Sequence, residues 1–139
     1  MNFPRKLFLA VAMIVSASIA ADEPKDSTPM TLNLSNQQLS NVPEDIFSHS
    51  SLEELWLDNN RIRELPDAIS QLTALKRLSI YKNQLTVFPK MLLQMANLER
   101  INASQNKLDS IPAEIKNLAN LQVLDLNYNE LECLPDELG

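Results

Sequence analysis

Two residues of this chain are of types that support covalent catalysis, and together they would supply a thiol nucleophile and its general base. They are the only histidine, His49, and the only cysteine, Cys133, and such a pair must lie within hydrogen-bond reach. The only glycine is Gly139, which excludes a glycine-rich phosphate-binding loop. Histidine and cysteine do not cluster with the spacing of metal ligands. The sequence therefore predicts no metal and no cofactor, and catalysis depends on where His49 and Cys133 lie.

A period of 23 residues sets the separation of those two residues. Prolines follow the period at five places and asparagines at four, with Gln37 one step before the first asparagine. These residues are Pro43, Pro66, Pro89, Pro112 and Pro135, and Asn60, Asn83, Asn106 and Asn129. His49 falls in the first unit and Cys133 in the fifth, so four stacking steps of ~4.8 Å place them roughly 19 Å apart. That distance excludes a Cys–His dyad, and we expect no enzymatic activity.

Each unit carries the same apolar pattern. In the second unit it consists of Leu52, Leu55, Leu57, Ile62, Leu65, Ile69 and Leu72. The alternation Leu55-x-Leu57 is typical of a short half-buried strand. One unit has too thin an apolar face to close a core, so stacked units must share one core with their strands in a parallel sheet. Each proline is expected at the first position of a short helical or 3₁₀ turn on the opposite, convex side, where the acidic residues that follow most prolines suit the helix start.

The resulting pattern, L-x-x-L-x-L-x-x-N-x-L-x-x-L-P-x-x-I-x-x-L, resembles the leucine-rich repeat family over about residues 30–139. The 23-residue length with Leu-Pro-x-x-Ile is similar to the class found in Ras-pathway scaffolds, scribble-type polarity proteins and many bacterial repeat proteins. The resemblance implies an α/β solenoid of about five units, the last incomplete. Short parallel strands would line its concave face and short helical or 3₁₀ turns its convex face.

The periodic asparagines are expected to form a structural ladder. Each follows its strand by three residues, where the chain turns inward and its buried backbone needs hydrogen-bond partners. A short amide supplies both a donor and an acceptor to the adjacent unit. Gln37 is one methylene longer, so we expect the first unit to hold its corner less well.

The strand residues that alternate with the buried leucines are predicted to face the concave surface. Tryptophan, tyrosine and arginine are enriched in binding hot spots, and these positions contain the only tryptophan and both tyrosines. The candidate ligand-binding residues are Trp56, Tyr81, Arg77, Arg100, Glu54, Asp58, Asp125 and Tyr128. Trp56, Tyr81, Arg77 and Arg100 form the favoured patch. The alternative is an ordinary solvated sheet in which Arg77 pairs with Glu54.

The first 20 residues have the layout of a secretory signal peptide. Arg5 and Lys6 precede an apolar run, and small residues lead to a cleavage position after Ala20. Residues 21–29 are predicted to be a flexible lead-in. The net charge of −6, from 12 basic and 18 acidic residues, becomes −8 when Arg5 and Lys6 are removed. We therefore expect a secreted or periplasmic protein that binds no nucleic acid and does not insert into a membrane after cleavage.

Three further features leave alternatives open. Cys133 has no intramolecular partner, so it is either a small side chain beside Leu134 or forms a disulfide with another protein. The sequons at Asn33 and Asn102 are either coincidental or glycosylated. The pattern ends one apolar position after Pro135 without a polar cap. The last unit is accordingly expected to be frayed, to associate with a second copy, or to continue into further sequence.

The sequence as a whole favours an exported protein-binding module that holds a protein or peptide ligand on its concave sheet. One alternative is the truncated repeat part of a secreted effector or receptor whose catalytic or anchoring domain is absent. Another is a purely structural element of an envelope or an adhesive surface.

Overall fold

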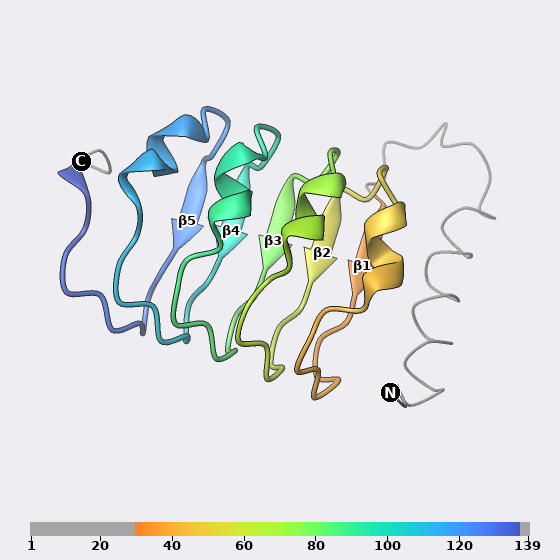
Figure 1. The fold of residues 1–139 in the computed structure, drawn as a ribbon, viewed down its shortest axis with the longest axis horizontal. Coiled ribbons are helices and arrows are strands. Elements are labelled where there is room, and N and C mark those ends of the chain that lie inside the picture. The colour runs from red at the N-terminus through yellow and green to blue at the C-terminus, as the bar shows by residue number, and fades with distance from the viewer. Residues whose placement is uncertain (1–29, 137–139) are drawn as a thin grey trace.

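The structure is a computed structural model that describes residues 30–136 (Figure 1). The predicted signal peptide and lead-in, residues 1–29, lie outside the described residues, as do residues 137–139. The described chain alternates short strands with 3₁₀ helices. The strands are β1 (Thr31–Asn33), β2 (Glu54–Trp56), β3 (Arg77–Ser79), β4 (Arg100–Asn102) and β5 (Val123–Asp125). The helices are η1 (Glu44–Ser48), η2 (Asp67–Gln71), η3 (Lys90–Gln94) and η4 (Ala113–Asn117).

The strands form one parallel sheet in the order in which they occur in the sequence. Each residue pairs with the residue one period later, as Leu55 pairs with Leu78. The backbone hydrogen bonds between neighbouring units continue beyond the assigned strands, since the amide of Leu57 donates to the carbonyl of Ser79 at 2.8 Å. Figure 1 shows the strands side by side, with the helices in a second row. The predicted leucine-rich repeat solenoid is confirmed.

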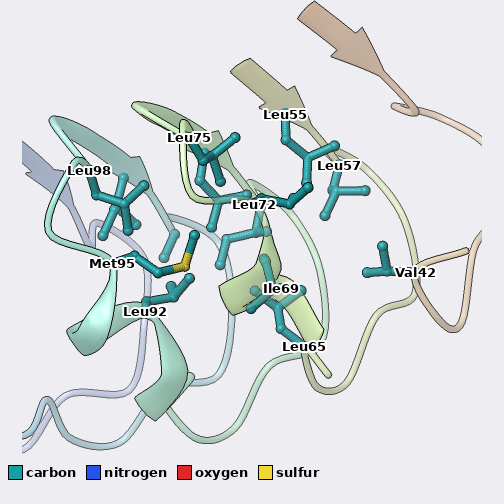
Figure 2. Close-up of a cluster of buried hydrophobic side chains, with 14 of the residues drawn as sticks. Val42, Leu55, Leu57, Leu65, Ile69, Leu72, Leu75, Leu92, Met95 and Leu98 are labelled. Atoms are coloured by element: carbon teal, nitrogen blue, oxygen red, sulfur yellow. The ribbon is translucent and has the colours of Figure 1, made fainter. Parts of the chain in front are cut away.

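A continuous apolar core fills the space between the sheet and the helices. In units two to four the strand residues predicted to face inward are buried, among them Leu55, Leu57 and Leu78. Each helix adds at least one buried anchor, for example Ile69 in η2 and Leu92 in η3. Figure 2 shows that Leu55, Leu57 and the two helix anchors meet between the strands and the helices. Burying one such side chain contributes about 1.5–3 kcal/mol, so stacking of neighbouring units is the main source of stability.

The periodic prolines lie one residue before each helix, so the expectation that they occupy the first helical position is corrected. Pro66 has a ψ of 153° and caps η2, and its carbonyl accepts the amide of Ile69 at 3.1 Å. Pro89 holds the same position before η3 and its carbonyl accepts the amide of Leu92 at 3.0 Å. A proline fits here because its φ is already fixed and only its carbonyl is needed.

The core thins at the last described unit. β5 pairs with β4 in the common register, but Leu124 and Leu126 are only half-buried, and Leu134 is 55% exposed. Their counterparts Leu78 and Ile80 in the third unit are buried. Within residues 30–136, no polar segment covers this edge of the core. Each described helix has five residues, and none is long and apolar enough to cross a membrane.

Candidate ligand-binding face

The periodic asparagines hold adjacent units together at the corner after each strand. The side-chain oxygen of Asn83 accepts the amide of Ile62 in the preceding unit at 3.0 Å. Its side-chain nitrogen donates to the carbonyl of Leu57 in that unit at 2.9 Å and to Ile80 in its own unit at 3.1 Å. Asn83 is 8% exposed. Because buried backbone groups need partners, one amide satisfies both sides of the interface between two units.

The other three asparagines repeat this arrangement. Asn106 accepts the amide of Leu85 at 3.0 Å and donates to the carbonyl of Ile80 at 2.9 Å. Asn60 and Asn129 bond to their preceding units in the same way. Gln37 is exposed and only its backbone amide takes part, donating to Asn60. Four asparagine side chains therefore link adjacent units in the described chain, and these bonds help to hold neighbouring strands at a constant distance.

The residue before each ladder position adopts a left-handed backbone conformation. These residues are Asn36, Asn59, Lys82, Gln105 and Tyr128, with φ between 53° and 61°. Non-glycine residues are uncommon in this region, and asparagine is enriched there. The two asparagines in this column, at positions 36 and 59, are the sequence signal that could have revealed it. Tyr128 is the bulkiest member and is 81% exposed, so no packing offsets its backbone strain.

The face of the sheet that is turned away from the helices is called the concave face here. Its first row, which consists of the first residue of each strand, contains a buried carboxylate. Glu54 is 8% exposed. It accepts a hydrogen bond from the Thr31 hydroxyl at 3.1 Å and forms an ion pair with Arg77 at 2.7 Å. Both oxygens are therefore occupied, and the alternative pairing of Arg77 with Glu54 is the one that the structure shows. Glu54, which the sequence predicts to contact a ligand, orients the Arg77 side chain.

The other predicted carboxylates brace the chain where it leaves the strands. Asp58 accepts hydrogen bonds from the Ser79 hydroxyl and from the amide of Tyr81, the latter at 3.0 Å. Asp125 accepts the amide of Asn127 at 3.0 Å. The amide oxygens of the two sequon residues serve similar turns: Asn33 accepts the amide of Ser35, and Asn102 accepts the amide and hydroxyl of Ser104. Asp58 therefore links the second unit to the third, whereas Asp125, Asn33 and Asn102 hold the backbone two residues further on through local bonds.

Among the aromatic and basic side chains of the second to fourth units, four on the concave face remain available to a ligand. Trp56 and Tyr81 are half-buried, and Lys82 and Arg100 are exposed. Between residues 30 and 136, none of the four makes a side-chain hydrogen bond or an ion pair. We call these four residues, with Arg77, the concave patch. Adjacent strands are ~4.8 Å apart, so the patch spans three neighbouring units. Lys82 is its one member missing from the sequence-based set of site residues.

The two candidate catalytic residues lie in different units of the described chain. His49 follows η1 in the first unit, and Cys133 is exposed in the fifth. Among residues 30–136 there is no group of three or more metal-ligating side chains. Lys76 lies beside the first row, and its hydrogen bond to Glu53 at 2.9 Å raises its pKa above 10.5. The face can therefore bind through shape, charge and aromatic contact.

Comparison with known proteins agrees with this architecture. A family model described as leucine rich repeat matches residues 30–85 and 50–108, and a model of two leucine rich repeats matches residues 96–138. No curated protein matches the sequence. A leucine-rich repeat protein of Leptospira interrogans is 29% identical, with a TM-score of 0.63. Internalin C2 of Listeria monocytogenes is 30% identical, with a TM-score of 0.66.

The leucine-rich repeat domain of APL1B shares the fold at 22% identity, with a TM-score of 0.67. The three alignments cover 99%, 74% and 93% of the present chain, respectively. They cover only 37%, 44% and 37% of the three solved chains. The present chain therefore spans less than half the length of each.

Proposed function

Because the chain belongs to the leucine-rich repeat family, we propose that it is a non-catalytic module that binds a protein or peptide on its concave face. Members of this family typically bind proteins. The proposal depends on one observation: the indole of Trp56 lies on the sheet surface and makes no hydrogen bond within the described chain. A repeat array does not need a tryptophan there for packing, whereas buried aromatic anchors dominate binding interfaces.

Substitution at Trp56 tests this function. A ligand captured with the mature chain should bind Trp56→Ala more weakly by ~2 kcal/mol or more. Val87→Ala is the matched control, because Val87 is also apolar and 64% exposed but lies outside the concave patch. Both variants should unfold at the wild-type urea concentration. If Val87→Ala weakens binding and Trp56→Ala does not, the site lies elsewhere on the molecule.

A second candidate is the repeat part of a longer secreted effector or receptor. It is favoured by the solved relatives, whose chains are more than twice as long as their aligned parts. In that case the concave face would select the target while another domain acts on it. Sequencing the gene beyond the codon for Gly139 distinguishes the two, since an in-frame continuation supports this candidate and a stop codon excludes a C-terminal extension.

We further propose that the module acts outside the cytoplasm. The support is the pattern of residues 1–20, a basic start followed by an apolar run and small residues before Ala21. N-terminal sequencing of protein purified from the producing cells should begin at Ala21. A chain that retains Met1 in the cytosolic fraction would overturn this part of the proposal.

Self-association is a further proposal, supported by the last described unit of the core. Within the described residues β5 is the final strand of the sheet, and its unit contains the half-buried Leu124 and Leu126 and the exposed Leu134. A second copy could pair with the free edge of β5 and cover these side chains. Sedimentation should then show a concentration-dependent dimer that Leu134→Lys abolishes. A monomer at all concentrations would exclude this property.

A further inference from the structure

The central two units of the concave face hold an excess of positive charge. Arg77 and Arg100 pair directly across β3 and β4, and like charges in this position are destabilising. The nearest carboxylate in the row, Glu54, has both oxygens occupied by Thr31 and Arg77. Arg100 forms no ion pair within residues 30–136. The row therefore keeps one exposed, unneutralised guanidinium.

Lys82 extends this excess along the third unit. It is exposed, and its backbone is held in the left-handed conformation with φ 54°. The other third- and fourth-unit positions of the face are uncharged: Ser79, Tyr81, Asn102, Ser104 and Gln105. Arg77, Arg100 and Lys82 are called the cationic strip here. The whole chain has a net charge of −6, so the charge of the strip is opposite in sign to that of the chain. An anionic group is attracted to the strip and repelled by the acidic remainder of the surface, which favours one binding position.

An aromatic platform lies beside the strip. Trp56 of β2 is in register with the small Ser79 of β3, and Tyr81 follows two residues after Ser79. Arg100 lies two strand steps from Trp56 and is offset from it by two residues along the strand, so the two positions are about 12 Å apart at ~4.8 Å per step and ~3.3 Å per residue. In an extended peptide, side chains four residues apart point to the same face and are about 13 Å apart. Two such side chains can therefore reach Trp56 and Arg100 together.

We propose that the concave patch binds an acidic peptide segment. One carboxylate of the segment contacts Arg100, and an apolar side chain four residues away packs on Trp56 and Tyr81, while Lys82 adds positive charge at the other end of the same face. Arg77, already paired with Glu54, lines the site without supplying the main anion contact. This specificity rests on the proposed function and adds the chemistry of the partner. A carboxylate can accept two parallel hydrogen bonds from the N–H groups at the edge of an arginine guanidinium.

Trp56 provides a label-free test because it is the only tryptophan of the chain. The probes are tryptophan-free nonapeptides with a Leu-x-x-x-Glu core or its reverse, each paired with the counterpart in which Gln replaces Glu. Acidic peptides should change Trp56 fluorescence saturably, and the Gln peptides should bind at least about tenfold more weakly. Arg100→Gln should remove most of this difference. Lys107→Gln, which removes an exposed cation of the same unit away from the strand, should keep it.

The outcomes separate this inference from the proposed function. No binding of any acidic peptide, or equal binding of the Glu and Gln peptides, overturns the inference. Equal or tighter binding of a single-stranded oligonucleotide assigns the cations to another polyanion and also overturns it. If a captured protein ligand requires Trp56 but ignores Arg100→Gln, the proposed function stands without the acidic specificity. If Trp56→Ala leaves that ligand unaffected, the proposed function itself fails.

Discussion

Asn83→Ala tests how the corner ladder couples adjacent units. The substitution removes the only hydrogen-bond acceptor described for the buried amide of Ile62, and an orphaned buried donor costs about 1–3 kcal/mol. The carbonyls of Leu57 and Ile80 each lose one donor but keep another, from Asn60 and Asn106 respectively. These two losses add only about 0.5–1 kcal/mol each. We therefore expect the free energy of unfolding to fall by about 2–5 kcal/mol.

Asn129→Ala is the matched control for this experiment. Asn129 makes the same bonds to Leu108, Ala103 and Leu126 but is only half-buried, so water can replace part of what is lost. Its loss should cost roughly 1 kcal/mol. Urea denaturation followed by circular dichroism measures both variants. A change below about 0.5 kcal/mol for Asn83→Ala, or equal losses for the two variants, would refute the proposed coupling.

Three further predictions concern stability. Tyr128→Gly should raise the free energy of unfolding by about 0.5–1 kcal/mol, because glycine adopts the left-handed backbone conformation of this exposed residue without strain. A lower free energy of unfolding in urea would show instead that the tyrosine side chain contributes stabilising contacts. Glu54→Ala should cost about 1.5–3 kcal/mol by leaving the hydrogen bond to Arg77 unmade, whereas a neutral result would deny the carboxylate its structural role. The raised pKa of Lys76, caused by its hydrogen bond to Glu53, means that the pair contributes stability below pH 10.5 and loses it as pH rises through the higher folded-state pKa. Wild type and Lys76→Met should therefore converge in stability above that pH, and a constant difference across pH 7–12 would contradict this.

The sequence predicts the fold because the repeat period determines register. Once Leu55 and Leu78 are placed one period apart, their pairing in a parallel sheet follows, and so do the buried core and the asparagine corners. The predicted position of the prolines relative to the helices is wrong by one residue. The sequence pattern locates the turn but does not tell whether the proline supplies the carbonyl that opens the helix or the first residue within it.

The composition of the candidate site was less accessible from the sequence. Register placed Glu54 beside Arg77, but only the side-chain conformations show that both carboxylate oxygens are occupied. Lys82 lies in the column beside the corner, where no residue-type signal sets it apart from its neighbours. Its importance depends on Arg100 lacking a partner, and this follows from the geometry of the described residues.

The affinity of Trp56→Ala for a captured ligand, measured beside that of Val87→Ala, is the most direct test of a binding site on the concave face. We predict that Trp56→Ala weakens binding by about thirtyfold or more, which corresponds to ~2 kcal/mol, and that Val87→Ala matches wild type. Wild-type affinity in Trp56→Ala, with a protein that unfolds normally in urea, would contradict the assignment of the concave face as the binding surface.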